Sequence, residues 1–256
     1  MTILTCLLLA ILGASWGSFL NAVGMRVLSI RQDQLNSLRG SGLGLKDRSC
    51  CFHCKKQLDF GELVPIASFL FFRGKSKCCH VDLPYRYILS ELYFLFLFPV
   101  LFLIDQDFAH VVAHIFLFST LYLLVMSDIF YLEVPIYLLV LAAVSLILEI
   151  GLGSLGILFD IFFRFGVGFC VLYLSGLLTS ALSGRSSLGA ADPIVFGVLS
   201  AHLKFTSMPY FLLISSLVGI VWWYISGRQI RIPFVPSIFV AFNLIFLAEK
   251  PFIYFS

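Results

Sequence analysis

The chain has 256 residues, of which 60% are hydrophobic and 12% are charged. Soluble domains carry about 25% charged residues, so this composition excludes an ordinary water-soluble globular protein. The net charge of +3 decides little, because in a membrane protein the location of the positive charges matters more than their sum. Runs of about 20 apolar residues, enough for a helix to cross a bilayer, recur along nearly the whole chain. The sequence therefore predicts an all-α polytopic membrane protein.

The first predicted membrane helix covers residues 3–23. No basic residue precedes it and a basic loop follows, so we expect a retained helix with its N-terminus outside, and not a cleaved export signal. Its second half contains Gly17 and Ser18, small residues that permit another helix to approach closely. The amide of Asn21 needs a partner inside the membrane, and we interpret it as a member of an ordinary interhelical hydrogen bond.

The only long polar segment, residues 24–86, follows this span. It holds eleven of the 17 Lys and Arg residues, which are Arg26, Arg31, Arg39, Lys46, Arg48, Lys55, Lys56, Arg73, Lys75, Lys77 and Arg86. The positive-inside rule therefore predicts that this loop is cytoplasmic. Within it, residues 40–44 are typical of a flexible connector. Residues 63–72 are apolar and interrupted by Pro65, and we expect them to pack on the membrane face or on a small core of the loop.

Seven further apolar runs follow, and each is predicted to be a membrane helix. They cover residues 87–104, 108–126, 134–148, 155–182, 193–203, 209–225 and 233–248. The turns at 105–107 and 151–156 then lie outside. The fold class expected is thus about eight transmembrane helices with a cysteine-containing cytoplasmic loop domain between the first two.

The remaining basic residues agree with this count of spans. Arg185, Arg228 and Arg231 fall on loops that the count places inside, whereas Lys204 and Lys250 fall outside. The charge asymmetry therefore supports eight spans with both termini outside.

Two aspartates stand at the cytoplasmic ends of predicted spans. Asp128 follows an uncharged apolar run, and Asp192 follows the long run that ends near Leu182. Two carboxylates brought together by their helices can share a proton, although an acid at a helix end can also simply mark the water interface. Asp160 and Arg164, four residues apart on one helical face, are interpreted as a structural ion pair near the outer side.

Five of the seven cysteines crowd into the polar loop, and they are Cys50, Cys51, Cys54, Cys78 and Cys79. Clustered cysteines favour metal binding on a reducing face and disulfides on an oxidising face. The side of the membrane on which the loop lies therefore decides between metal binding and disulfides. Cys6 and Cys170 lie in apolar runs, where a buried, inert thiol is expected.

In this order and spacing, the motifs resemble those of the bacterial type IV prepilin peptidases, polytopic aspartic proteases of the inner membrane. The resemblance covers nearly the whole chain and rests on Gly17-Ser18-Phe19-Leu20-Asn21, Cys51-Phe52-His53-Cys54, Arg73-Gly74-Lys75-Ser76-Lys77-Cys78-Cys79, Arg86-Tyr87…Glu91, Asp128…Pro135 and Gly189-Ala190-Ala191-Asp192. It implies that Asp128 and Asp192 are the catalytic pair and that no metal is needed for cleavage. The substrates it implies are type IV prepilins or type II secretion pseudopilins, cut on the cytoplasmic side after a glycine.

The resemblance also implies roles for the cysteine loop. Family members usually carry two Cys-x-x-Cys pairs, and four thiolates suit a structural tetrahedral zinc. Here Cys51, Cys54 and Cys79 occupy three of those positions, whereas Ser76 stands at the fourth. Cys78 or His80 would have to substitute, so we expect any zinc to be bound less tightly than in relatives with two full pairs. S-adenosylmethionine is implied only if the family's N-methyltransferase activity is retained.

The second aspartate motif departs as well. The family has Gly-x-Gly-Asp, usually with Lys two residues later, whereas this chain has Ala191 before Asp192 and Ile194 at the Lys position. A methyl group at residue 191 penalises a positive φ there, so the loop is expected to differ slightly. The place two residues after Asp128 often carries a second acid, and here it is Phe130.

The sequence predicts three parts: a first transmembrane helix at 1–23, a cysteine loop for zinc and methyl transfer at 24–86, and a membrane peptidase domain at 87–256. We expect prepilin substrates, membrane lipid and no nucleic acid as partners, and a multi-pass location in the bacterial inner membrane. Three alternatives stay open. They are a degenerate homologue that binds pilins without cutting them, a proton-coupled transporter, and an intramembrane protease of presenilin type.

Overall fold

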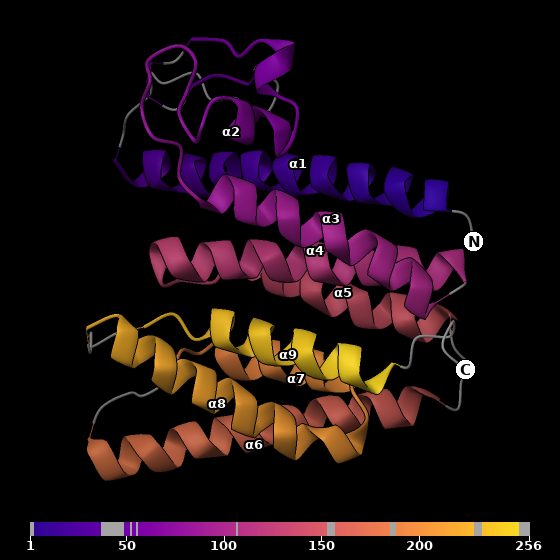
Figure 1. Ribbon diagram of the computed structural model, residues 1–256. Coiled ribbons are helices and arrows are strands. Elements are labelled where there is room, and N and C mark those ends of the chain that lie inside the picture. The colour runs from indigo at the N-terminus through magenta and orange to yellow at the C-terminus, as the bar shows by residue number, and fades with distance from the viewer. Residues whose placement is uncertain are drawn as a thin grey trace. The chain divides into compact units, whose positions relative to one another are not determined.

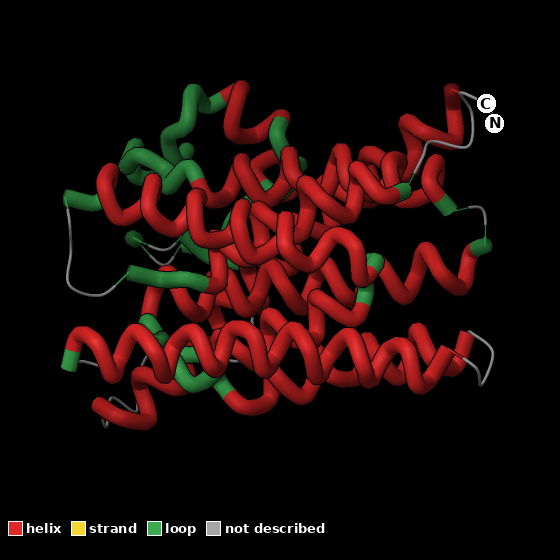
Figure 2. Tube along the Cα trace, turned by 90° about the horizontal axis from the view of Figure 1, so that it is seen from below, coloured by secondary structure: helices red, strands yellow, loops and turns green. Residues whose placement is uncertain are grey.

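The structure is a computed structural model, which describes residues 3–36, 49–51, 53–54, 56–105, 107–152, 157–184, 188–227 and 232–250. The described chain is helical and contains no β-strand (Figure 2), so the predicted all-α fold class is confirmed. Some predicted features lie outside the described residues: the connector at 40–44, most of the turn at 151–156, and the basic residues Arg39, Lys46, Arg48, Lys55, Arg185, Arg228 and Arg231.

Eight apolar helices coincide with the eight predicted spans. They are α1 (Ile3–Asn36), α3 (Arg86–Ile104), α4 (Phe108–Tyr131), α5 (Ile136–Leu152), α6 (Ile157–Ser183), α7 (Asp192–Ala201), α8 (Met208–Ile225) and α9 (Val235–Glu249). Five of them, α1, α3, α4, α6 and α8, are long and apolar enough to cross a membrane, and the other three are shorter. The protein is therefore a multi-pass membrane protein.

The chain divides into two compact units, Met1–Leu103 and Ile104–Ser256. In the first unit, α1 continues to Asn36, well beyond the predicted end of its span at residue 23. The part of α1 that is apolar enough to cross a membrane, Ile3–Val27, also ends four residues past the predicted bound. The residues from Met25 to Asn36 include no glycine or proline that would stop it.

Close packing of α1 on α3 organises the first unit (Figure 1). A Cβ atom added at Gly13 or Gly17 would overlap the backbone carbonyls of Phe94 and Ser90, so only glycine permits this approach. Asn21 donates from Nδ2 to Ser90 Oγ at 3.3 Å. The predicted close approach and interhelical hydrogen bond are thus confirmed, and α3 is identified as the partner helix.

Between α1 and α3 lies the cysteine-containing segment, with little regular structure. It includes a 3₁₀ turn, η1 (Phe60–Glu62), and a short helix, α2 (Ala67–Phe71). Its chain folds back on itself through isolated bridges that pair Cys50 with Gln57 and Lys75 with Asp82. These pairings form two turns, each of which carries cysteines.

In the second unit, the short helix α7 is almost entirely buried and packs on α5, α6 and α9. Phenylalanine rings fill the adjoining core, and they belong to Phe118, Phe196, Phe211, Phe242 and Phe246. Because α7 lies in the middle of this packing, its first residue, Asp192, is held inside the unit. A polar residue thereby acquires a fixed place in an apolar core.

The expected ion pair in α6 is confirmed. Arg164 Nη2 lies 2.8 Å from Asp160 Oδ2. The same guanidinium donates from Nη1 to the carbonyl oxygen of Leu203, just past the end of α7. Arg164 therefore ties α6 to the α7 end opposite Asp192, which is a structural role.

Candidate functional site

The second unit contains a cavity of about 940 Å³ that both Asp128 and Asp192 line. Its walls come from the end of α4, from α6 and α8, from the loop before α7, and from the segment that leads into α9. The two aspartates are each 7% exposed and are separated by 64 residues of sequence. The structure thus brings the two predicted site residues to the same cavity.

Asp128 is fixed by the beginning of α9. Its Oδ2 accepts a hydrogen bond of 2.9 Å from the backbone N–H of Val235, the first residue of that helix. The next residue, Pro236, has no N–H, and the following two N–H groups bond to the carbonyl of Phe234. Val235 therefore offers the unused first-turn N–H of α9, and Asp128 takes it. The positive end of the helix dipole also favours a carboxylate at this place.

Asp192 is fixed by its own loop. Its Oδ2 accepts a 2.9 Å hydrogen bond from the N–H of Gly189, and its N–H donates to the Gly189 carbonyl at 3.3 Å. A Cβ at Gly189 would lie 3.1 Å from this Oδ2, so the glycine leaves room for the carboxylate. Ala191 has φ −81°, an ordinary right-handed conformation. The expected penalty for a methyl group at residue 191 is therefore absent from this structure.

The rest of the cavity is mixed in character. Apolar side chains such as Leu172 and Trp223 alternate with hydroxyl groups of Ser175 and Thr179. Among its described lining residues there is a third acid, Glu133, and no Lys or Arg. The cavity therefore suits a partly apolar ligand that also carries positive charge.

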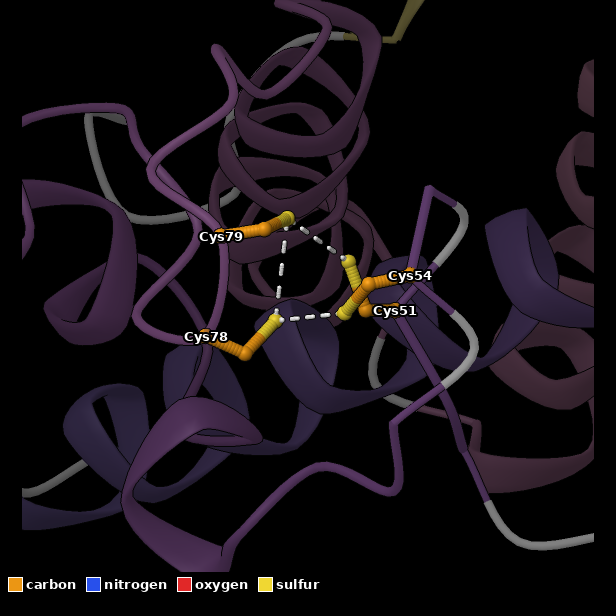
Figure 3. A group of neighbouring side chains, drawn as sticks. All are labelled: Cys51, Cys54, Cys78 and Cys79. Atoms are coloured by element: carbon orange, nitrogen blue, oxygen red, sulfur yellow. Dashed lines mark hydrogen bonds between the residues drawn. The ribbon is translucent and has the colours of Figure 1, made fainter.

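The first unit contains a cluster of four cysteines, Cys51, Cys54, Cys78 and Cys79, whose sulfur atoms all lie within 4.8 Å of one another (Figure 3). The Sγ atoms of Cys54 and Cys78 are 3.2 Å apart, and those of Cys51 and Cys79 are 3.7 Å apart. In a tetrahedral zinc site with Zn–S bonds of about 2.3 Å, sulfur atoms are about 3.8 Å apart. The four thiols are thus close to the spacing that one zinc ion requires.

Cys78, and not Ser76, completes this cluster. Ser76 is buried and accepts the N–H of Val81 at 3.2 Å, while its hydroxyl lies 3.1 Å from the Cys79 sulfur. Ser76 therefore contacts the Cys79 thiol without being a member of the cluster. Cys78 was one of the two substitutes that the sequence suggested, but its spacing alone could not separate it from His80.

The thiols differ in acidity. Desolvation opposes the thiolate of Cys51, but the backbone N–H groups of Cys54 and His53 outweigh it and lower the pKa of Cys51 to about 7. The hydrogen bond with Cys54 raises the pKa of Cys78 to about 12. Metal ligands must be thiolates, so a bound cation has to displace the proton of Cys78.

A second cavity, of about 340 Å³, lies in the first unit next to the cysteine turns. Its lining includes the carboxylates of Glu62 and Glu91 and the rings of Phe69, Phe72 and Tyr87. Glu91 is buried near the start of α3, where its Oε2 accepts the N–H of Ile66 at 2.7 Å. The structure thus gives this acid a contact with the cysteine-containing segment that the sequence did not reveal.

Two family models match the chain and together cover most of it. The model described as the bacterial peptidase A24 N-terminal domain matches residues 11–104, and the model of the type IV leader peptidase family matches residues 115–224. The fold and these matches define a multi-pass membrane peptidase.

Curated relatives agree with these matches. A protein from Pectobacterium carotovorum subsp. carotovorum is 27% identical over 224 residues, which cover 83% of this chain and 80% of the relative. One from Neisseria gonorrhoeae is 28% identical and covers 84% and 79%, and one from Bacillus subtilis is 27% identical and covers 90% and 89%. All three are named prepilin leader peptidase/N-methyltransferase. No solved structure matches. The chain belongs to the type IV prepilin peptidase family.

Proposed function

We propose that this protein is an aspartic endopeptidase that removes the leader of type IV prepilins or type II secretion pseudopilins. The observation that carries the proposal is the common cavity of Asp128 and Asp192, in which each carboxylate has one oxygen fixed by a backbone N–H. Two nearby carboxylates ionise together only at high free energy, so they share a proton. The relatives' names and the family match support the same activity.

In this mechanism one carboxylate takes a proton from a water molecule, which attacks the scissile carbonyl. The protonated partner donates its proton to the carbonyl oxygen, which gives a tetrahedral gem-diol. The first carboxylate then passes its proton to the amine nitrogen as the C–N bond breaks, and the partner carboxylate takes a proton back as the new carboxyl group forms, so no covalent intermediate is needed. The N–H groups of Val235 and Gly189 are positioning groups, because they hold the two carboxylates in orientation while the proton moves.

The lining of the cavity supports a substrate with a basic leader joined to an apolar helix. Three acids face the cavity, and they attract the positive charges of such a leader. The apolar lining and the neighbouring hydroxyl groups suit the segment that follows the cleavage site. Cleavage after a glycine follows from the family resemblance alone.

We place this reaction on the cytoplasmic side of the bacterial inner membrane. The basic residues between Gly24 and Arg86 motivate this orientation. A membrane-impermeant reagent added from the periplasm should therefore label a cysteine introduced at Asp107 and leave Cys54 unlabelled. Labelling in the reverse pattern would place the carboxylate pair on the wrong side for a cytoplasmic leader.

The direct test is co-expression with the host's own pilin-like proteins, followed by mass spectrometry of their N-termini. Wild-type protein should yield the trimmed form. Asp128→Asn and Asp192→Asn should each lower the cleavage rate by roughly 10³-fold or more, with unchanged membrane insertion. Asp160→Asn serves as the control, since its carboxylate pairs with Arg164. A wild-type protein that captures pilins and leaves them uncut would establish the degenerate homologue instead.

A second activity, N-methylation of the new pilin N-terminus, is supported by the cavity of the first unit. Its carboxylates, Glu62 and Glu91, can accept hydrogen bonds from ribose hydroxyl and amino groups, and Phe69 and Tyr87 offer apolar surface for a base. Its volume falls in the range of small-molecule sites. These residues fit S-adenosylmethionine, which would supply the methyl group. Glu62→Gln should then reduce both methylation and binding of the donor, measured by calorimetry, and leave leader cleavage intact.

The four-cysteine cluster is proposed to hold a structural zinc ion. Cys51, Cys54, Cys78 and Cys79 would be its ligands, and the ion would fix the turns that border the methyl-transfer cavity. We retain the predicted division of labour: the loop at 24–86 serves metal binding and methyl transfer, and proteolysis belongs to the part that follows.

A further inference from the structure

The outward face of α2 and its flanking turns is apolar. We call this the apolar face, and it consists of Phe60, Leu63, Val64, Leu70 and Phe71, all of which are exposed. Phe60 and Phe71 each expose 82% of their surface. Large apolar side chains that are exposed together in one short segment indicate a surface that something covers.

This face is not an unfinished core. In α2 the exposed residues are Ala67, Leu70 and Phe71, which share one side of the helix. The opposite side carries Phe69, whose ring lies against Gly74 and 6.4 Å from the ring of Tyr85. One side of α2 is therefore already packed against its own segment, and the exposed apolar side is not needed for that packing.

The depth of α2 along α3 indicates what covers it. Ile66, just before α2, donates its N–H to Glu91, which lies five residues after Arg86, the first residue of α3. At a rise of 1.5 Å per residue, the contact is about 7.5 Å along that helix. Because α3 is long enough to cross the membrane, α2 lies level with the first turns of a transmembrane helix.

The backbone is bent to reach this depth. Ile66 has φ 60°, a conformation that β-branched residues rarely adopt. Such an outlier persists only where its surroundings hold it, and the hydrogen bond to Glu91 does so here. The turn keeps α2 beside the helix instead of letting the segment rise into water.

An exposed apolar stripe also runs along α3 itself. Tyr85, Leu89 and Phe96 are exposed and share one side of that helix and its N-terminal extension. Tyr85 borders α2 through the ring of Phe69. A tyrosine at the head of a transmembrane helix is typical of the membrane interface. The exposed stripe of α3 thus begins at a residue that packs against the inward side of α2.

Basic side chains follow α2 in the chain. Arg73 is exposed directly after α2, and Lys75 and Lys77 follow it in the chain. Both lysines stay more than half exposed, although Lys75 is 4.0 Å from Asp82 and Lys77 is 3.2 Å from Asp59. Positive charges beside an apolar helix face favour anionic lipid headgroups.

We infer that α2 is an interfacial helix, which inserts Leu70 and Phe71 into the boundary between headgroups and acyl chains of the bilayer that α1 and α3 cross. It anchors the cysteine-containing segment at the membrane surface. The inference depends on the membrane crossing of α3 and not on the proposed chemistry.

The test is photocrosslinking in the full-length protein. p-Benzoylphenylalanine replaces Phe71, whose exposed ring it resembles, or Asp82, an exposed residue at the other end of the segment. Each variant is irradiated in nanodiscs of phosphatidylethanolamine and phosphatidylglycerol, and covalent adducts are identified by mass spectrometry. We expect phospholipid adducts at residue 71 and several-fold fewer at residue 82.

Two outcomes would overturn the inference. Equal lipid adducts at the two positions would show that the apolar face is not inserted. Adducts at residue 71 to another part of this chain in nanodiscs, or to a pilin in co-expressing cells, would identify a protein as the occupant. The double variant Leu70→Ser/Phe71→Ser provides a second measurement. When phosphatidylglycerol is removed from the nanodiscs, hydrogen exchange at α2 should rise in the wild-type protein and stay unchanged in the variant.

Discussion

The two candidate sites are held together in different ways. Asp128 and Asp192 lie at helix termini in a packed unit, and backbone N–H groups fix both carboxylates. The four thiols lie on turns with little regular structure, where sulfur atoms mainly contact one another. A site built on helix packing is present without any ligand, whereas a cluster of thiols reaches its stable form only with a cation to neutralise it.

The same contrast explains how each site tolerates its departure from the family pattern. At the aspartate site, Ala191 adopts an ordinary helical conformation and leaves the hydrogen bond of Asp192 intact. At the cysteine cluster, Ser76 is a poor zinc ligand, but Cys78 lies close enough to replace it. The aspartate site accommodates Ala191 because the backbone there has an ordinary conformation. The cysteine cluster accommodates Ser76 because the neighbouring Cys78 supplies a thiol.

The largest expected effect separates the two sites completely. Cys51→Ser removes a buried thiol of the proposed zinc site, so the purified protein should contain no zinc and the processed pilin should lack the N-terminal methyl group. Leader cleavage should persist, because the carboxylate pair lies in the other unit. Metal analysis and mass spectrometry of the same pilin sample measure both effects.

Cys50→Ser is the matched control for this experiment. Cys50 neighbours Cys51 in the chain but is not part of the four-sulfur group, so zinc should be retained. Zinc content is the readout of this control, because Cys50 also lines the cavity of the first unit. Loss of cleavage in Cys51→Ser would contradict the separation of the two activities.

The next effect concerns the backbone donor to Asp128. Val235→Pro removes the N–H at the first position of the helix, where proline itself fits, but it also disfavours the helical ψ of −27° at Phe234. A hydrogen bond to a charged group contributes about 1.5–3 kcal/mol, so kcat should fall by roughly 10- to 100-fold. KM for the pilin should change little, since Val235 holds the carboxylate and not the leader.

Val235→Ala is the control, because it trims the same buried side chain and keeps the N–H. If both variants lose activity equally, packing at residue 235 and not its hydrogen bond would be responsible. A rise in KM with unchanged kcat would instead assign this segment to substrate binding.

The sequence predicted the helical regions well, because apolar runs and their flanking charges follow directly from the bilayer. It also predicted that the two aspartates come together, since a carboxylate at the end of an apolar run stands out, and the structure brings both to one cavity. It could not find Val235, whose contribution is a backbone N–H 107 residues away from its partner. Nor could it choose between Cys78 and His80, because that choice depends on which side chain the turn directs toward Cys54.

A smaller effect should follow when the family pattern is restored in the cysteine cluster. Ser76→Cys places a thiol 3 residues before Cys79, the spacing that Cys51 and Cys54 already have. It relieves the need for two adjacent residues, Cys78 and Cys79, to bind one ion. Zinc should then be held more tightly in competition with a chelator, and Cys78→Ser should become harmless in this background. If the double variant Ser76→Cys/Cys78→Ser still loses zinc, the new thiol at residue 76 does not replace Cys78 as a ligand.

The smallest effect is expected when the family pattern is restored at the aspartate site. Ala191→Gly removes a methyl group from a residue with φ −81°, where glycine has no conformational advantage. The main consequence is a greater loss of backbone entropy on folding, which costs about 0.5–1 kcal/mol and should lower the melting temperature slightly. The rate of leader cleavage should stay within about twofold of wild type, since such small changes lie within the usual effect of a neutral substitution. The measurement is single-turnover cleavage beside thermal unfolding in the same detergent. A large gain in cleavage would mean that the reacting loop needs a left-handed residue at 191, and that the Gly-Ala-Ala-Asp sequence weakens the enzyme in a conformation other than the one seen here.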